Sequence, residues 1–565
     1  MADASKKNTV LEKTSENDGS SEEIAYAPTT TGKEAEATTS VLSTVDTLEA
    51  QSEVVPNPFL NDKVADHYRD LYETTHYECR KRFDPEFTWT AEEQKKLNRK
   101  LDWKVALLAC VLFVSLQTDR GNLGQAVADN MLKELNMTNN QYNTGNTIFY
   151  LCFLSAELPS QLISKRLGCD IWIPIEMCLW ALVSLSQCKL TSATGFYITR
   201  ALLGVFEGGF IPDLVLWMSY FYTGAELTIR LSFFWTSMAL TQIVTSVLAY
   251  GIFHLRGVGG MGGWSWLFLI EGLMTLVIGI AGFFLMVPSA VQTKKPWNKN
   301  GWFTEREEYI VVNKILRDDP TKGDIHNRQG LTPKMLWEAM CDYYLWPVYI
   351  IGIVAYVPMN ALTAYLTLLL KSMGYSTFDV NLLAIPNYVL HFILLLWITW
   401  YSEKTRSIFN VCLFQPLWAV PLLGVLRWWN GSFADKWPTY VVITLILATP
   451  YIHAMMVSVC SRNAQSIKTR TVSASLYNMF VQAGSIIASN IFQVKDAPLY
   501  HKGNAALFGL AAAMIPLLIF TKWFYVTINN RREKKWSAMT YEEREHYILT
   551  TKDKGSSRLN FRFAH

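Results

Sequence analysis

Long apolar stretches alternate with short polar ones over most of this chain. Between about residues 103 and 528 the apolar stretches are about 20 residues long, enough for a helix to cross a ~30 Å hydrocarbon core. A membrane-spanning segment must satisfy its own backbone hydrogen bonds, so stretches of this length predict helices. We predict an all-α membrane protein with twelve transmembrane helices, at 103–123, 143–163, 171–188, 194–216, 231–253, 264–287, 345–370, 379–400, 408–427, 438–460, 471–492 and 504–528.

Polar segments divide these spans into larger units. A long central loop, 288–344, separates an amino-terminal half, 101–287, from a carboxy-terminal half, 345–528, with six spans in each. The same Arg-x11-Gln spacing opens the fifth and the eleventh spans. Such a faint repeat is typical of two halves related by a parallel pseudo-repeat.

The two ends of the chain are polar. Residues 1–55 are rich in Ser, Thr and Glu and predict a disordered tail. Residues 56–100 form a charged amphipathic segment, in which a capping box at Thr90 and Glu93 begins a helix. A second tail, 529–565, follows the last span.

The distribution of basic residues predicts the orientation of the spans. Lys165, Arg166, Arg230 and Lys404 lie in short loops on the same side as both termini, and cytoplasmic loops carry an excess of Lys and Arg. Both termini are therefore expected to be cytoplasmic. The two glycosylation sequons begin at Asn136 and Asn430, and both fall in loops expected to face outward.

Composition excludes several classes of protein. The net charge of +3 over 565 residues does not favour nucleic-acid binding. The nine cysteines are scattered without a CxxC spacing, so we expect neither a metal site nor a disulfide framework. The chain contains no Walker A sequence, HExxH or GxSxG. We therefore expect no enzymatic activity and no cofactor, and ion gradients rather than ATP as the energy source.

Four charged residues in the first and fourth spans carry the functional prediction. Asp119 and Arg120 lie near the end of the first span, and Arg200 and Glu207 lie in the fourth. A charge in the bilayer core costs at least ~2.5–3.5 kcal/mol, so such residues indicate function. Arginine binds carboxylates and sulfonates with a planar fork of donors, and a buried acid can gain and lose a proton. These residues predict a transporter that couples protons to an anion, although a static network that locks helices together is the alternative.

The fourth span also predicts how it packs. Arg200 and Glu207 share one helix face about 10 Å apart, because seven residues make nearly two turns. Gly204 and Gly208 form a small-xxx-small pair that lets another helix approach closely. If the first and fourth spans adjoin, Asp119 can pair with Arg200.

Other polar residues in the spans are weaker candidates. Glu176 and Glu271 are expected near an interface, in a solvated or helix-packing role. Four further side chains are candidates to contact a substrate: Asn360, Tyr365, Asn387 and His453.

Several segments resemble one family. The chain is similar to fungal carriers of the major facilitator superfamily, in the anion:cation symporter group known as the allantoate permease family. This resemblance implies the major facilitator fold, with two six-helix halves that alternate in access. The segments that carry it are Arg200–Pro212, Gly263–Gly272, Phe303–Glu305, Ser461–Ala464 and Ala474–Met479.

The resemblance also implies residue roles and substrates. Asp119 and Glu207 would take part in proton coupling, Arg120 would hold the substrate anion, and Arg200 would pair with Asp119. Members of the family move allantoate, nicotinate, pantothenate, biotin and sulfur-containing anions. Residues 316–324 and residues 552–559 of the second tail resemble the branch associated with sulfonates and other sulfur compounds.

We therefore expect a multi-pass, monomeric plasma-membrane carrier that imports a small organic anion, a carboxylate or a sulfonate, together with protons. Three alternatives remain open from the sequence. They are a vitamin-type anion permease, a nutrient receptor that keeps the carrier fold without transporting, and a carrier of the vacuole or another organelle.

Overall fold

The computed structural model describes residues 57–60, 62–74, 76–318, 320, 333–405, 407–432, 435–464, 467–496, 500–540, 543–544, 546–547, 551 and 555–565. The chain divides into two units, Met1–Val55 and Pro56–His565. The first unit, which contains the predicted disordered tail, lies outside the described residues.

The described residues form helices joined by loops, without a β-strand, which confirms the predicted all-α class. Each predicted span is one helix or two consecutive helices. The amino-terminal half contains α4 (Leu107–Ala128), α6 (Asn139–Leu167), α7 (Cys169–Ser186), α8 (Ala193–Glu207) with α9 (Phe210–Ser219), α10 (Gly224–Ile252) and α11 (Gly263–Leu285). The carboxy-terminal half contains α15 (Trp346–Ala355) with α16 (Val357–Ser372), α17 (Thr377–Thr405), α18 (Ile408–Cys412) with α19 (Phe414–Trp428), α20 (Lys436–Leu447) with α21 (His453–Asn463), α22 (Ile467–Ser489) and α23 (His501–Ser537).

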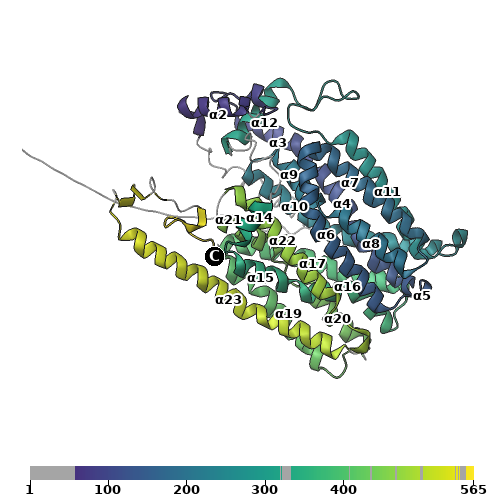
Figure 1. The fold of residues 1–565 in the computed structure, drawn as a ribbon. Coiled ribbons are helices and arrows are strands. Elements are labelled where there is room, and N and C mark those ends of the chain that lie inside the picture. Colours follow the sequence, from purple (N-terminus) through teal and green to yellow (C-terminus); the bar gives the residue numbers. More distant parts are fainter. Residues whose placement is uncertain are drawn as a thin grey trace, which may run out of the picture. The chain divides into compact units, whose positions relative to one another are not determined.

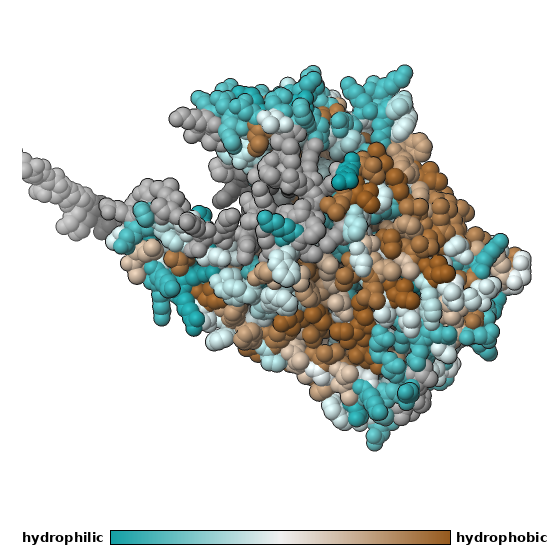
Figure 2. Space-filling model, in the orientation of Figure 1, coloured by the Kyte–Doolittle hydropathy of each residue, from teal (hydrophilic) through white to brown (hydrophobic). Residues whose placement is uncertain are grey.

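The outer surface of these helices is apolar. Among the described residues, nine helical segments are long and apolar enough to cross a membrane. Figure 2 shows hydrophobic residues gathered along the sides of the helices, with hydrophilic residues toward their ends. Large apolar side chains such as Val277 and Ile280 on α11 and Ile519 on α23 are more than 45% exposed. An exposed apolar surface of this kind is the one that contacts lipid.

The ninth span divides at Leu413, between α18 and α19. Three other spans are interrupted. The fourth span breaks at Gly208 and Gly209, directly after Glu207, the last residue of α8. The seventh breaks at Tyr356, ahead of Pro358, and the tenth breaks between α20 and α21. Inside a membrane, irregular backbone is tolerated where protein or a water-filled pathway covers it. These three breaks therefore mark the interior of the protein rather than its lipid-facing surface.

A small assembly covers one end of the amino-terminal half. It combines α2 (Asp62–Thr74), α3 (Ala91–Leu101) and the central-loop helix α12 (Glu305–Asp318), which lie together in Figure 1. Phe59 and Tyr72 pack with Val312 and Leu316 of α12 in one buried cluster. The capping box predicted at the start of α3 is confirmed. We call this end of the helices the central-loop face and the other end the opposite face.

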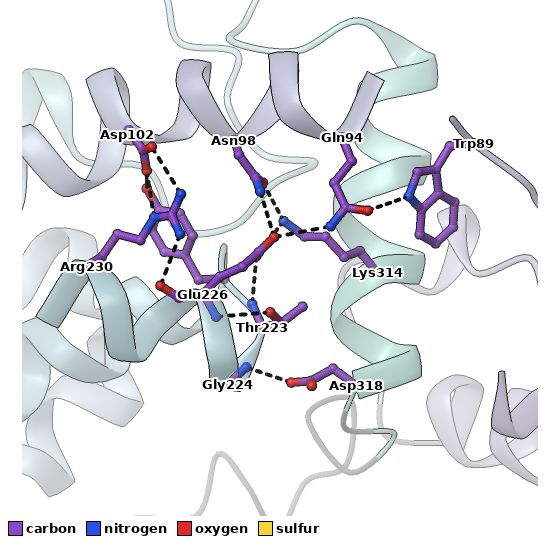
Figure 3. A network of polar contacts seen from close by, with 11 residues as sticks. Trp89, Gln94, Asn98, Asp102, Thr223, Gly224, Glu226, Arg230, Lys314 and Asp318 are labelled. Carbon is purple, nitrogen blue, oxygen red and sulfur yellow. Dashed lines mark hydrogen bonds and ion pairs between the residues drawn. The ribbon is translucent and has the colours of Figure 1, made fainter. Parts of the chain in front are cut away.

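A buried ion pair attaches α12 to the amino-terminal half. Lys314 donates to the carboxylate of Glu226 at 2.8 Å and to Asn98 Oδ1 at 2.9 Å, and Asn98 in turn donates to Glu226 at 2.7 Å. Thr223, which caps α10, donates its backbone N–H to the same carboxylate (Figure 3). The side chains of Lys314 and Glu226 are only 4% and 9% exposed. The central loop is thus fixed to the fifth span.

Replacing Lys314 by methionine is expected to destabilise this assembly. Burial alone would raise the pKa of Glu226, but the Lys314 charge and the surrounding hydrogen bonds lower this pKa to about 2. An acid whose folded-state pKa lies below its unfolded value of ~4.3 stabilises fully above pH ~4.3, and this contribution is lost as the pH falls through about 2. At neutral pH, removing one partner of a buried pair costs about 3–5 kcal/mol. The measurement is the thermal unfolding temperature in detergent, which we expect to be lower for Lys314→Met than for the wild type.

Two further variants serve as controls for this prediction. Adding Glu226→Gln to Lys314→Met should recover part of the loss, because no uncompensated charge then remains buried. The exposed pair of Arg306 and Glu93 provides a matched control, and Arg306→Met should change the unfolding temperature much less. Equal effects of Lys314→Met and Arg306→Met would contradict the central role of the buried pair.

The segment at the end of the chain packs against the carboxy-terminal half. Asn529 donates to the backbone carbonyl of Phe563 and accepts from its N–H, both at 2.9 Å. Asn463 makes the same two contacts with Ala564, at 3.1 and 2.7 Å. The end of the chain therefore connects α21 with α23, and α23 extends to Ser537, beyond the predicted end of the last span.

Candidate functional site

Asp119 lies inside the amino-terminal half. Its carboxylate accepts hydrogen bonds from Trp180 Nε1 and from Ser184 Oγ, both at 3.0 Å, and both donors lie on α7. The residue is 3% exposed. The expected pairing of Asp119 with Arg200 is therefore wrong: Asp119 faces the third span, where two neutral side chains donate to it.

Arg120, the next residue, makes the ion pair at the centre of the site. Its Nε donates to Glu207 Oε2 at 3.0 Å, which joins the first span to the end of α8. The guanidinium lies over the ring of Phe153, 4.9 Å from its centroid. The side chain of Arg120 is 24% exposed, whereas that of Glu207 is 2% exposed. Arg120 Nη2 has no hydrogen-bond partner among the described residues, so the pair retains an unused donor.

Arg200 lies on the same helix as Glu207. Its guanidinium stacks on the ring of Phe149 at 4.5 Å, and the residue is 6% exposed. Arg200 Nε has no hydrogen-bond partner within the described part of the chain. A buried, stacked guanidinium with an unused donor is suited to bind an anion.

Gly204 and Gly208 explain how α8 reaches these positions. A Cβ at Gly204 would collide with the backbone carbonyl of Phe149, and one at Gly208 would collide with that of Phe153. Both carbonyls belong to α6, which also supplies the two rings beneath the arginines. Close packing of α8 on α6 therefore sets where the guanidinium groups lie.

An aromatic cluster from the carboxy-terminal half surrounds His453. The His453 ring lies 5.6 Å from the rings of Tyr356, Tyr451 and Tyr477, and also 5.6 Å from Trp235 of the amino-terminal half. His453 Nδ1 has no hydrogen-bond partner among the described residues. His453 thus contacts aromatic residues of both halves.

Three other predicted substrate residues make hydrogen bonds that do not involve Arg120. Asn360 donates to Ser485 at 3.0 Å, and Asn387 donates to the carbonyl of Ala384 within its own helix. The hydroxyl of Tyr365 donates toward Asn143 Oδ1 at 2.5 Å and lies 3.0 Å from the carbonyl of Phe492. Tyr365 thus bridges the two halves at the opposite face.

Further hydrogen bonds between the halves gather at this same face. Tyr142 and Asn143 of α6, together with Ala128 and Asn130 before it, contact the carboxy-terminal half through Ala364, Phe492, Thr377 and Lys371. By contrast, α9, α15 and α21, which lead toward the central-loop face, pack mainly within their own halves. The halves are therefore joined at the opposite face in this conformation.

Two acidic residues differ from their predicted surroundings. Glu176 is 1% exposed and accepts from Ser160 at 2.5 Å, while Glu271 is 0% exposed. The solvated role is wrong for both, and their burial agrees with the other predicted role, in helix packing. Asn136 and Asn430, the proposed glycosylation residues, lie on exposed loops. The structure brings Asn122 close to Glu271, a contact for which the sequence gave no signal beyond the polarity of the two residues.

Comparison with known proteins agrees with this architecture. The family model described as Major Facilitator Superfamily matches residues 109–489. The chain is 42% identical over 524 residues to Uncharacterized transporter YIL166C of Saccharomyces cerevisiae, covering 92% of this chain and 96% of that protein. It is 26% identical over 454 residues to MFS-type transporter cnsO of Penicillium expansum, covering 79% and 86%.

Two solved structures are similar in fold alone. A bacterial homolog to human lysosomal transporter Spinster, in an inward-facing and unoccupied conformation, has a TM-score of 0.55 at 13% identity and covers 74% of this chain and 95% of its own. The xylose transporter XylE from E. coli, in a partially occluded inward open conformation, has a TM-score of 0.54 at 13% identity, with 73% and 97% covered.

Proposed function

Since this chain belongs to the Major Facilitator Superfamily, we propose that it is a secondary active transporter that imports a small organic anion together with protons. The substrate class is a carboxylate or a sulfonate, with sulfur compounds first among the candidates. The plasma membrane is the proposed location, with both termini in the cytoplasm.

The ion pair between Arg120 and Glu207 is the single observation that carries this proposal. While Glu207 is ionised, it occupies the guanidinium of Arg120. A proton on Glu207 would weaken this pair, and the planar fork of Arg120 could then bind an anion with two parallel hydrogen bonds. Proton and anion would therefore bind together, which is the requirement for symport.

Three other residues extend the proposed substrate path. Arg200 adds a second guanidinium on the side of Glu207, and its unused Nε suits a second oxygen of the anion. His453 and Asn360 would contact the rest of the substrate from the carboxy-terminal half. Asn387 donates to the carbonyl of Ala384 in its own helix. Its proposed role is to set the local shape of this helix rather than to contact the substrate.

Alternating access is proposed to run through the contacts between the halves. With hydrogen bonds gathered at the opposite face, the conformation suits release toward the central-loop face. The inward-facing Spinster homolog and the inward open XylE structure, both similar in fold, support this reading. The hydrogen bond from Tyr365 to Asn143 would break when the opposite face opens and form again when it closes, so Tyr365 would not bind the substrate.

The test is uptake of labelled anions by cells that lack related carriers, at acidic external pH, with and without a protonophore. The panel contains ethanesulfonate, allantoate, nicotinate, pantothenate and biotin. We expect uptake of one compound that the protonophore abolishes. Uptake that the protonophore leaves unchanged would contradict proton symport, and no uptake from the panel by protein confirmed at the cell surface would contradict the substrate class.

A further inference from the structure

A cluster of polar side chains lies buried between α4, α7 and α11. Asp119 and Asn122 are one turn apart on α4, and Glu271 and Thr275 are one turn apart on α11, which packs against both α4 and α7. These four residues are 3%, 1%, 0% and 0% exposed. We call them the buried polar cluster. It lies within the amino-terminal half, and its member Asp119 is within electrostatic reach of Glu207.

The cluster contains several polar atoms without hydrogen-bond partners. Both carboxyl oxygens of Glu271 and both polar atoms of the Asn122 amide make no hydrogen bond of good geometry among the described residues, whereas Thr275 approaches the carboxylate of Asp119. A buried polar group without a hydrogen-bond partner is destabilising. Asp119 differs, because Trp180 and Ser184 already donate to it. Around Glu271, the polar side chain that approaches the carboxylate is the neutral Asn122 amide.

The described groups around Glu271 also provide no positive charge to compensate an ionised carboxylate. From α4, the titratable group that faces it is Asp119, and from α7 the neighbouring donors, Trp180 and Ser184, are neutral. Arg120 directs its charge toward Glu207 instead. Within the described residues, no Lys or Arg forms an ion pair with Asp119 or Glu271. Two ionised carboxylates here would be buried without compensation, which is costly.

We propose that Glu271 is a second proton-binding site of the transport cycle. The Glu271 carboxylate takes a proton from water and becomes a carboxylic acid, whose O–H donates to Asn122 Oδ1 while Asn122 Nδ2 donates back to the other carboxyl oxygen. Asp119 keeps its hydrogen bonds from Trp180 and Ser184. Loss of the proton returns it to water and restores the carboxylate. This inference deepens the proposed function and rests on it: one proton binds at Glu207 and a second at Glu271.

Infrared difference spectroscopy tests the proton site without any substrate. The purified full chain in lipid is measured on acidification, in the carbonyl-stretch region of protonated carboxyl groups. We expect a band in the wild type that is lost in Glu271→Gln and retained in Glu176→Gln, the matched variant of another buried acid. Glu271→Asp should shift the band and keep it. A wild-type spectrum from which Glu271→Gln removes no band would overturn the proposal.

Two more outcomes are decisive. If sodium chloride, compared with choline chloride, alters the wild-type spectrum or its unfolding temperature and Glu271→Gln removes that effect, the cluster binds sodium and the proton assignment is wrong. If the Glu271 band is present but uptake of the labelled panel is independent of protons, the proton site stands and the proposed symport fails. A retained unfolding temperature in Glu271→Gln shows that the variant is folded.

Discussion

Replacing Arg120 by alanine is expected to reduce uptake of the transported anion by about a hundredfold or more at limiting concentration. Hydrogen bonds to charged groups contribute about 1.5–3 kcal/mol each, and ~1.4 kcal/mol corresponds to a tenfold change in binding. Loss of two such bonds therefore accounts for about two powers of ten. The measurement is initial uptake of the labelled anion, normalised to the protein at the cell surface.

Two further variants make the result specific to Arg120. Arg120→Lys keeps the charge but loses the planar fork, so we expect uptake between that of the wild type and that of Arg120→Ala. Arg99→Ala changes an exposed arginine at the central-loop face and should leave uptake unchanged. Normal uptake by Arg120→Ala would show that this residue does not bind the anion.

Replacing Glu207 by glutamine is expected to separate exchange from accumulation. A glutamine cannot take up or release a proton, and its neutral amide resembles the protonated acid in shape. Arg120 is then free for the anion throughout the cycle. In proteoliposomes, we expect exchange of internal for external labelled anion to continue, while accumulation driven by a pH gradient falls to the background level. Glu92→Gln, at an exposed position on α3, is the control and should retain both activities.

The opposite pattern would be informative as well. If Glu207→Gln still accumulates the anion in response to a pH gradient, then the proton is not carried at Glu207. If both exchange and accumulation are lost while the variant unfolds at the wild-type temperature, Glu207 acts on anion binding rather than on coupling.

The hydrophobic pattern was sufficient to predict the spans. All twelve appear in the structure, because about 20 apolar residues in succession have no other stable arrangement in a bilayer. The Major Facilitator Superfamily fold implied by the resemblance is confirmed by the family match and by the solved structures. The breaks after Glu207 and before Pro358 coincide with glycine and proline, so their local causes are also visible in the sequence.

The contacts among the charged residues could not be predicted in the same way. Asp119 and Arg120 are neighbours in the chain, and neighbours on a helix point about 100° apart. Only one of them can face α8, and it is Arg120; Asp119 faces α7. The sequence places both residues at the same depth and does not give the rotation of the helix that chooses between them.

Burial and long-range contacts set the same limit elsewhere. Glu271 was predicted near an interface, yet it is fully enclosed, because α11 turns this face toward α4 and α7. Tyr365 contacts Asn143 across 222 positions in the chain. Such a contact depends on how the two halves meet, and the periodicity of a single helix carries no information about that.

The most direct test of proton–anion coupling records external pH and labelled-anion uptake together, in weakly buffered cells that express the chain. On addition of the transported anion, we predict that the medium becomes more alkaline in step with uptake, and that Glu207→Gln abolishes this change. Anion uptake at the wild-type rate without any change of external pH would contradict the account.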